Sequence, residues 1–253
     1  MYKTVILCGG KGVRLSEETV EIPKPMVKIN NTPILLSIMH LYSKHNFNDF
    51  ILCLGYKSEI IKEFFYNYHK NNSDIKVNLN NNNIEFLKKQ EENISVSLID
   101  TGLDSLTGDR ISQIEEYIKE DLFLLTYGDG LCDININELV KFHKSHNKMV
   151  TLTAIQKKGK FGTIQTDNNT VTSFSEKPID DDYINGGYFV CNKEIFSLLQ
   201  KEDFAYILGK LAKQNELMCY KYSGNWECMD TINDKNNLEK MENEGNAFWK
   251  VWE

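Results

Sequence analysis

Short runs of β-branched and aliphatic residues alternate with amphipathic helical patterns in the first half of the chain, and this alternation restricts the possible folds. Strand-like runs at residues 4–8 and 49–54 are each followed by a helical pattern, at residues 34–45 and 59–69. Such alternation is typical of βαβ units arranged around a largely parallel sheet. We therefore predict an α/β fold.

Turn and cap residues support these elements. Thr32 is expected to cap the helix at 34–45, with Pro33 at its first helical position, and Ser58 to precede the next helix. The asparagine-rich residues 78–83 are expected to form a small surface hairpin or loop. We interpret that stretch as a surface insertion and not as a domain boundary.

A carboxylate follows a predicted buried strand in the middle of the chain. After a strand at 94–100 and a helix near 111–119, a strand at 122–127 ends on Gly128-Asp129-Gly130. The second half then predicts strands at 150–155, 162–166, 170–174, 187–191 and 217–222, and helices at 136–145, 193–200, 204–213 and 231–244. This half is expected to extend a mixed sheet.

The charge and cysteine content exclude several classes of protein. A net charge of -7 without clustered Lys or Arg argues against a nucleic-acid partner. The six cysteines form no C-x-x-C pair and are expected to be reduced and buried. No apolar run approaches the roughly 20 residues of a membrane helix, and no signal sequence is recognisable, so we expect no membrane partner and a cytoplasmic location. The five histidines show no metal-ligand spacing and are expected to be surface or half-buried residues.

A glycine-rich loop with two cations follows the first predicted strand. Its residues are Leu7, Cys8, Gly9, Gly10, Lys11, Gly12, Val13 and Arg14. Glycines let backbone N–H groups approach an anion closely, and the cations offset phosphate charge. A plain βα turn explains the glycines equally well. The loop is not a P-loop, because the sequence lacks the G-K-[ST] ending of that motif. It is not a dinucleotide-binding fingerprint either, because Leu15 stands where the third glycine is required and the ribose-binding acid is missing.

Taken together, the motifs resemble those of the sugar-phosphate nucleotidyltransferases, and within them the bacterial glucose-1-phosphate cytidylyltransferases. The resemblance covers nearly the whole chain. It rests on the glycine loop and on Pro23-Lys24-Pro25-Met26-Val27, Asp100-Thr101-Gly102 with Ser105 and Thr107-Gly108 before Arg110, Thr126-Tyr127-Gly128-Asp129-Gly130, Phe161-Gly162, Glu176-Lys177-Pro178, Ile184-Asn185-Gly186-Gly187, Met229-Asp230-Thr231 and the closing Trp249-Lys250.

The resemblance implies a Rossmann-like three-layer nucleotidyltransferase fold with a mixed, mostly parallel sheet and a small β/α extension on the sugar side. It implies one domain over residues 1–253, with 1–148 mainly the nucleotide-binding half and 149–253 mainly the sugar-binding half and C-terminal helix. The implied reaction joins CTP to a sugar 1-phosphate, releasing CDP-glucose and pyrophosphate for polysaccharide biosynthesis.

Roles for individual residues are also implied by the resemblance. The catalytic residues are Arg14, Lys24, Asp129 and Lys177; the nucleotide-binding residues are Leu7, Gly9, Gly10, Lys11, Gly12, Val13, Arg14, Ser105 and Arg110; the sugar-phosphate-binding residues are Gly162, Glu176, Lys177, Asn185 and Gly186. Asp129 and Asp230 are the implied ligands of Mg²⁺, which prefers carboxylate and phosphate oxygens. Taken singly, each has a simpler explanation: a surface lysine for Lys24, a turn-capping aspartate for Asp129 or Asp230, a solvated turn for Glu176-Lys177-Pro178.

The sequence departs from the family pattern at two places. Val13 replaces a threonine in the phosphate loop, and Asp203-Phe204-Ala205-Tyr206-Ile207-Leu208 stands where relatives carry a tryptophan-glutamate-x-glutamate-proline-leucine string on the sugar side. The acceptor is therefore open between glucose and another sugar or polyol phosphate, and the nucleotide between CTP and UTP or dTTP. A non-catalytic nucleotide-sensing domain is the alternative of another class. Oligomerisation is expected from the resemblance, with the aromatic tail 248–252 as the candidate contact.

Overall fold

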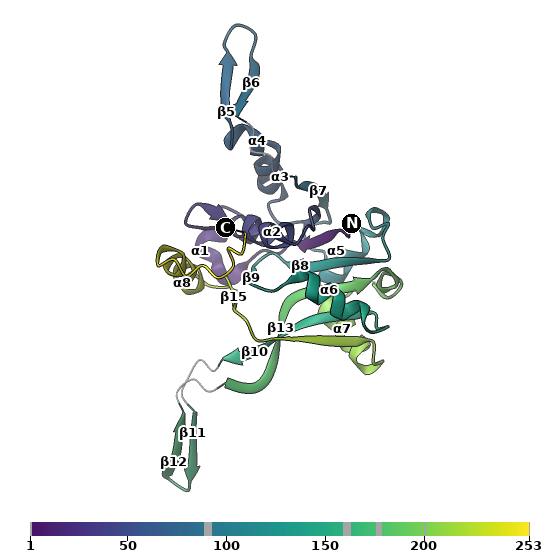
Figure 1. Ribbon diagram of the computed structural model, residues 1–253, viewed down its shortest axis with the longest axis vertical. Coiled ribbons are helices and arrows are strands. Elements are labelled where there is room, and N and C mark those ends of the chain that lie inside the picture. Colours follow the sequence, from purple (N-terminus) through teal and green to yellow (C-terminus); the bar gives the residue numbers. More distant parts are fainter. Residues whose placement is uncertain (1, 89–92, 159–162, 176–178, 200, 253) are drawn as a thin grey trace.

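Seven strands form the central sheet of the computed structural model, which describes residues 2–88, 93–158, 163–175, 179–199 and 201–252 (Figure 1). All neighbouring strands are parallel except at β13, which runs antiparallel to both β10 and β8. The spatial order is β14 (Leu217–Tyr222), β10 (Val150–Lys158), β13 (Ile179–Asn192), β8 (Leu122–Tyr127), β1 (Thr4–Leu7), β4 (Asp49–Leu54) and β7 (Ser95–Asp100). The predicted α/β fold with a mixed, mostly parallel sheet is confirmed.

Helices cover both faces of this sheet and give a three-layer arrangement. Successive residues of β1 show it, because Val5 packs in one apolar cluster and Ile6 in the other. The cluster around Ile6 contains residues of α2 (Ile34–Lys44), α6 (Ile136–Lys144) and α8 (Ile232–Asn243). The cluster around Val5 contains residues of α5 (Thr107–Ser112), α7 (Phe204–Lys213) and a 3₁₀ helix at Lys193–Leu198.

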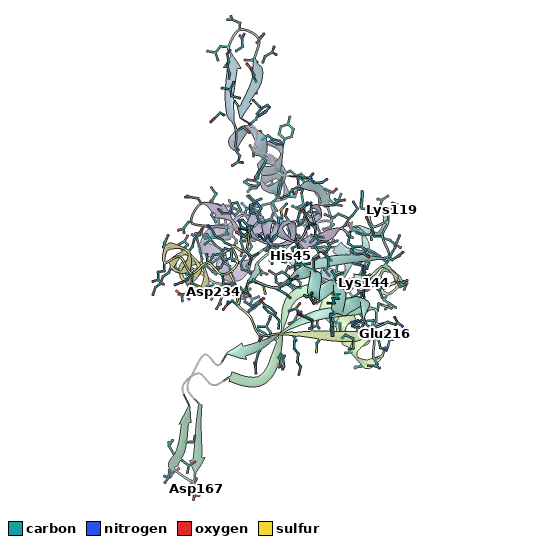
Figure 2. The ribbon with its side chains drawn as sticks, viewed as in Figure 1. His45, Lys119, Lys144, Asp167, Glu216 and Asp234 are labelled. Atoms are coloured by element: carbon teal, nitrogen blue, oxygen red, sulfur yellow. The ribbon has the colours of Figure 1, made fainter. Side chains whose placement is uncertain are left out.

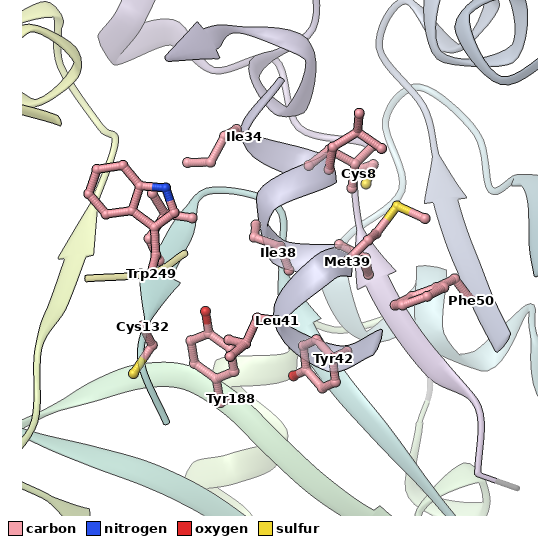
Figure 3. Packing of buried hydrophobic residues seen from close by; sticks show 14 of the residues in the cluster. Cys8, Ile34, Ile38, Met39, Leu41, Tyr42, Phe50, Cys132, Tyr188 and Trp249 are labelled. Carbon is pink, nitrogen blue, oxygen red and sulfur yellow. The ribbon is translucent and has the colours of Figure 1, made fainter. Parts of the chain in front are cut away.

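Helix α2 lies at the centre of the first cluster and is apolar on nearly all sides, as expected of a buried helix (Figure 3). The Tyr42 ring stacks on Tyr188 at 6.0 Å between centroids. Trp249 lies beside α2 and is 1% exposed. Trp249 therefore packs in the core of its own chain, and the subunit contact expected of the C-terminal tail stays a prediction. Burial of such a side chain stabilises the fold by roughly 2 to 3 kcal/mol.

Two hairpins project from opposite ends of the molecule (Figure 1). One, β5 (Asp74–Asn78) with β6 (Asn83–Lys88), confirms the predicted insertion and follows α3 (Ser58–Tyr66) and α4 (Tyr68–Asn71). The other is β11 (Thr163–Asp167) with β12 (Thr170–Ser175), and Asp167 lies at its far end (Figure 2). Short elements complete the chain: α1 (Ser16–Thr19), β2 (Lys28–Ile29) with β3 (Thr32–Pro33), β9 (Gly130–Cys132) with β15 (Trp226–Cys228), and 3₁₀ helices at Val13–Leu15, Lys24–Met26 and Glu115–Tyr117.

Several local predictions are wrong for identifiable reasons. The helix expected near 111–119 is α5 followed by a 3₁₀ turn, and the helix expected at 59–69 breaks at Asn67, which lies between α3 and α4. Thr32 pairs with β2 and leaves Pro33 as the cap of α2, while Lys57, in a left-handed conformation, precedes α3 in place of Ser58. Tertiary pairing outweighed local capping preference at these positions.

Two predictions of exposure also need correction. His143 is only 2% exposed: its Nδ1 lies 2.8 Å from Thr151 Oγ1 and its Nε2 lies 2.9 Å from Asn192 Oδ1. All six cysteines are free thiols, but Cys219 is exposed on the edge strand β14 and Cys228 is half-buried. None of the helices among the described residues is long and apolar enough to cross a membrane.

Candidate active site

A cavity of about 610 Å³ opens where β1 and β8 end, at the carboxyl edge at which open α/β sheets bind ligands. Most of the predicted site residues line it: Leu7, Gly9, Gly10, Gly12, Val13, Arg14, Lys24, Ser105, Arg110, Asp129, Asn185, Gly186 and Asp230. Lys11 does not line the cavity, and its ammonium pairs with Asp104 at 3.1 Å. Gly162, Glu176 and Lys177 lie outside the described residues, so their predicted roles stay predictions.

Lys24 lies between two carboxylates from distant parts of the chain. Its Nζ is 2.5 Å from Asp129 Oδ2 and 2.7 Å from Asp230 Oδ1. The Lys24 side chain is only 12% exposed, so the surface-lysine explanation does not hold. Arg14, which is largely exposed, pairs with the other oxygen of Asp230. Two cations and two carboxylates thus form one network in the cavity wall.

A two-stranded ladder brings these carboxylates together. Asp129 follows β8, and Asp230 follows β15, whose Cys228 pairs with Gly130 of β9. The Met229 N–H also donates to the Asp129 carbonyl at 2.9 Å. Asp230 in turn precedes the N-cap of α8, where Thr231 and Asp234 form a capping box. Both carboxylates are therefore held by backbone pairing and not by flexible loops.

The network keeps Lys24 charged. Burial alone lowers the pKa of Lys24, but the charge of Asp129 and hydrogen bonds to both carboxylates outweigh burial and raise the net pKa above its ordinary value. The neighbouring Cys228 behaves differently, because burial, followed by the charge of Asp129, raises the pKa of its thiol to about 12. At neutral pH the site therefore presents an ammonium and an uncharged thiol.

The donor atoms suit a hard divalent cation. One possible ligand atom from each of Asp129, Cys228 and Asp230 lies within 4.8 Å of the other two. Among the described residues, this is the one cluster of three or more His, Cys, Asp or Glu side chains close enough to hold a metal ion. The two carboxylates supply the oxygens that Mg²⁺ prefers, whereas a protonated thiol is a poor ligand for it. The residues present thus fit a Mg²⁺ site with one or two protein carboxylates, completed by substrate oxygens.

The three glycines of the loop have different reasons to be glycine. A Cβ on Gly9 would lie 2.2 Å from Arg110 Nη1, so the loop's own packing excludes a side chain there. Gly12 has a φ of +61°, which favours glycine. A Cβ on Gly10 would meet no atom within 4 Å, although Gly10 lines the cavity. The protein's own packing leaves space at Gly10, as expected where a ligand approaches the backbone.

Arg110 is buried beneath this loop and is 4% exposed. Its Nη1 donates to the carbonyls of Leu54 (3.0 Å) and Gly102 (2.6 Å) and to Thr101 Oγ1 (2.9 Å). Its Nη2 donates to the carbonyls of Gly9 and Leu103, each at 3.1 Å. The guanidinium therefore joins the glycine loop to the loop after β7. Burial lowers the pKa of Arg110, but an arginine remains charged in proteins.

Ser105 lies in the same second loop, on the cavity wall. Its hydroxyl donates to the Thr101 carbonyl at 2.5 Å, and the residue that caps α5 is Leu106, so Ser105 does not cap that helix. The Lys11–Asp104 pair spans the mouth between the two loops. The two loops are thus joined by this exposed ion pair as well as by the buried Arg110.

The opposite wall is made by the middle of β13 and by β15. Asn185 Oδ1 accepts from the Gly187 N–H at 2.9 Å, a Cβ on Gly186 would lie 2.6 Å from Ile155, and Gly187 has a φ of +80°, so both glycines are required by a tightly packed irregularity in the pairing of β13 with β10. Trp226 Nε1 donates to the Gly186 carbonyl at 2.8 Å, and Trp226 lines the cavity. Sequence analysis gave Trp226 no role here; its spacing of two residues from Cys228 on the same strand was the signal that could have placed both side chains in one cavity.

Tyr127 is a second cavity residue that sequence reasoning did not assign. Its ring lies against Gly187, where a Cβ would approach to 2.8 Å. Burial raises the pKa of Tyr127 to about 12, with a hydrogen bond to the Asn185 side chain acting in the opposite direction. The hydroxyl therefore stays protonated and can both donate and accept at this wall.

Comparisons with known proteins agree over almost the full length. The family model described as nucleotidyl transferase matches residues 3–239. The glucose-1-phosphate cytidylyltransferase of Salmonella typhi is 46% identical over 256 residues, covering 99% of this chain and all of the relative. The probable glucose-1-phosphate cytidylyltransferase of Bacillus subtilis is 41% identical over 254 residues, with the same coverage.

Solved structures share the fold at lower identity. The crystal structure of HddC from Yersinia pseudotuberculosis superposes with a TM-score of 0.69, covering 96% of this chain and 100% of that one at 23% identity. At this identity the likeness concerns the fold alone.

Proposed function

Since this chain belongs to the nucleotidyl transferase family, we propose that it transfers the cytidylyl group of CTP to α-D-glucose 1-phosphate and forms CDP-glucose and pyrophosphate. The observation that carries the proposal is the network of Arg14, Lys24, Asp129 and Asp230 in the wall of one cavity. The four charges come from separate parts of the chain and meet where the fold family binds its ligands.

The proposed reaction brings two anions together. A phosphate oxygen of glucose 1-phosphate attacks the α-phosphorus of CTP, a new P–O bond forms, and the bond from the α-phosphorus to the bridging oxygen breaks as pyrophosphate leaves. The chain needs no nucleophile of its own. Its contribution is in-line positioning and neutralisation of charge, which dominate catalysis of phosphoryl-type transfers.

Arg14 and Lys24 supply the positive charge on the protein side. Lys24 stays protonated; two of its three N–H groups donate to the carboxylates, and the third can donate to a triphosphate oxygen. Arg14 is largely exposed and can turn its planar fork from Asp230 to phosphate oxygens. These two side chains would stabilise the charge that develops on the leaving pyrophosphate.

We propose Mg²⁺ as the cofactor, held by Asp129 and Asp230 together with substrate oxygens. Bound there, the ion would neutralise phosphate charge as a Lewis acid. The two carboxylates have a second role, because their hydrogen bonds orient the Lys24 ammonium in the wall of the cavity.

The two halves of the chain divide the substrates in this proposal. Residues 1–148 supply the glycine loop, Ser105 and Arg110 for the nucleotide, and residues 149–253 supply the turn at Asn185 and Gly186 for the sugar. Gly162, Glu176 and Lys177 complete the sugar-phosphate side as sequence-based predictions. We also propose a cytoplasmic homo-oligomer, in keeping with the free cysteines and the CTP substrate.

A nucleotide panel tests the proposal. The protein is incubated with glucose 1-phosphate, MgCl₂ and each of CTP, UTP, dTTP and ATP, and released pyrophosphate is measured. Release with CTP is expected, with the Asp129→Asn variant as the background. Release with UTP or dTTP but not with CTP would overturn the nucleotide assignment, and saturable CTP binding without release would favour a sensing domain. Repeating the CTP reaction with other sugar and polyol phosphates tests the acceptor, which the departure at residues 203–206 leaves open.

A further inference from the structure

The last carbonyl of the glycine loop is bonded on the side that faces the interior of the protein. The Gly12 carbonyl accepts from the Leu15 N–H at 2.9 Å and from the Thr19 hydroxyl at 3.0 Å. Thr19 is 3% exposed, whereas Gly12 and Val13 line the cavity of the candidate active site. In a planar trans peptide the C=O and the N–H point in opposite directions, so these bonds turn the Val13 N–H away from Thr19. The Val13 N–H is therefore directed toward the cavity side of the loop.

The first carbonyl of the loop is bonded in the same way. The Gly9 carbonyl accepts from the Tyr56 N–H and from Arg110 Nη2, each at 3.1 Å. The N–H of the same peptide group, that of Gly10, points the opposite way, where a side chain on Gly10 would meet no atom within 4 Å. With its carbonyls bonded inside, the loop turns two N–H groups outward, and such backbone groups form an anion-binding concavity.

Thr19 contacts the loop through both branches of its side chain. Its hydroxyl also donates to the Leu15 carbonyl at 3.0 Å, and its γ-methyl lies against Gly12, where a Cβ would approach it to 2.9 Å. Glycine has wide conformational freedom, so its own backbone preference does not select the direction of the Gly12 carbonyl. The contacts with Thr19 and Leu15 select it.

The segment after β4 holds Thr19 in turn. The Tyr56 hydroxyl donates to the Thr19 carbonyl at 2.9 Å, while the Tyr56 N–H is bonded to Gly9. The neighbouring Lys57 donates from its ammonium to the Glu21 carbonyl at 3.1 Å. One short segment therefore contacts the loop at its start and again beyond its end.

We propose that Thr19 is a positioning residue for the reaction. Its hydroxyl, held in place by Tyr56, orients the Gly12–Val13 peptide so that the Val13 N–H donates to a phosphate oxygen of the bound triphosphate. Thr19 itself touches no substrate and acts only through Gly12. This inference rests on the proposed function in one respect, because it takes CTP as the triphosphate.

Two substitutions of Thr19 isolate its hydroxyl. Thr19→Val keeps the γ-methyl that lies against Gly12 and removes the donor, whereas Thr19→Ser keeps the donor. The Gly12 carbonyl retains its bond from Leu15 in both variants, so we expect both to fold, with a urea midpoint within about 0.5 M of wild type.

Thr4→Val is the matched control. Thr4 begins β1, the strand that leads into the same loop, and it is fully buried. Its hydroxyl finds no hydrogen-bond partner among the described residues. The control therefore makes the same chemical change without removing a bond to the loop.

Isothermal titration calorimetry with CTP and MgCl₂, without a sugar phosphate, measures binding at equilibrium. We expect Thr19→Val to bind CTP about tenfold or more weakly than wild type, as for the loss of one hydrogen bond to a charged group. Thr4→Val should match wild type, and Thr19→Ser should recover most of the affinity. Wild-type affinity in Thr19→Val, equal weakening in Thr4→Val, or no recovery in Thr19→Ser would each overturn the proposal.

Steady-state kinetics distinguish positioning from a general loss of structure. Thr19→Val should raise KM for CTP by a similar factor and leave KM for glucose 1-phosphate unchanged, because the oriented peptide contacts only the triphosphate. A proportional rise in both KM values would mean that the substitution disturbs the whole cavity, and the positioning role would be lost.

Inorganic tripolyphosphate separates this proposal from the proposed reaction. It has no base, so Thr19→Val should bind it more weakly than Thr4→Val does whichever nucleotide the protein uses. If CTP fails in the nucleotide panel and this difference remains, the nucleotide assignment falls and the role of Thr19 stands. Equal tripolyphosphate affinity in the two variants refutes the role of Thr19 whatever the panel shows.

Tyr56→Phe covers the case in which Thr19→Val does not fold. Tyr56 is half-buried, so water can replace its hydroxyl at the Thr19 carbonyl and the fold should be kept. We expect weaker binding of tripolyphosphate in Tyr56→Phe than in wild type, because Thr19 loses its support. Unchanged binding in this variant would contradict the proposed chain of contacts from Tyr56 through Thr19 to Gly12.

Discussion

The Arg110→Lys variant should be less stable than the wild type, although the substitution keeps the positive charge. Arg110 donates five hydrogen bonds from two nitrogen atoms to four carbonyls and one hydroxyl. Two of these acceptors also accept from a backbone N–H, the Leu54 carbonyl from Thr101 and the Gly9 carbonyl from Tyr56. The carbonyls of Gly102 and Leu103 have no other donor among the described residues, and each is bonded by a different terminal nitrogen of the guanidinium, so a single lysine ammonium leaves at least one of them unpaired. An unpaired buried acceptor costs about 1 to 3 kcal/mol and the lost bonds to the charged group add to this, so we expect Arg110→Lys to lower the free energy of unfolding by about 2 to 4 kcal/mol.

Urea denaturation followed by fluorescence measures this loss. With a slope of about 2 to 3 kcal/mol per molar urea, the midpoint should fall by roughly 0.7 to 2 M. The chain contains two arginines, and Arg14 supplies the control. Arg14 is largely exposed and makes a single ion pair, so Arg14→Lys should change the free energy of unfolding by less than about 0.5 kcal/mol. A loss below about 1 kcal/mol in Arg110→Lys would refute the view that the guanidinium holds the two loops together.

Three further predictions follow from the site and the core. Asp129→Asn should lower kcat by roughly a hundredfold or more, with a native far-UV circular dichroism spectrum, because it removes a charge from the site proposed for Mg²⁺; near-normal turnover would exclude that role. Gly10→Val should raise KM for CTP at least several-fold without moving the urea midpoint, since its side chain enters open cavity space, and an unchanged KM would place CTP elsewhere. Burial lowers the pKa of His143, so the unfolded state, with a pKa near 6.5, binds the proton more readily. The stability that neutral His143 contributes is full above about pH 6.5 and is lost as the pH falls, by at most about 1.4 kcal/mol at pH 5.5. The free energy of unfolding should therefore fall less between pH 7.5 and 5.5 in His143→Gln than in the wild type. An equal fall in both proteins would contradict a lowered pKa of His143.

The central sheet was largely predictable from the sequence because its strands have strong, short apolar patterns. The strands at 49–54, 122–127 and 217–222 and the helix at 204–213 have the predicted bounds. The family resemblance is confirmed by the full-length relatives. Local pattern failed where tertiary contacts decide, as at Thr32, which joins a strand pair, and at Asn67, where the helical pattern continues across a break.

The candidate site was predictable in its residues but not in its geometry. Asp129 and Asp230 were named from motifs, yet nothing in the sequence shows that Lys24 bridges them or that a strand ladder aligns them. Arg110 was assigned to the nucleotide, whereas the structure shows its donors on backbone carbonyls. The burial of Arg110 depends on contacts with the glycine loop, the end of β4 and the loop after β7, which are far apart in the chain, so no local sequence pattern predicts it.

The β9–β15 ladder also determines when this site can first exist during synthesis. Asp129 leaves the ribosome about 100 residues before Asp230, a delay of roughly 5 to 20 seconds at ordinary elongation rates. Until Asp230 emerges, a growing or prematurely terminated chain holds only three of the four side chains of the charged network. The complete network therefore first exists when the last tenth of the polypeptide is made.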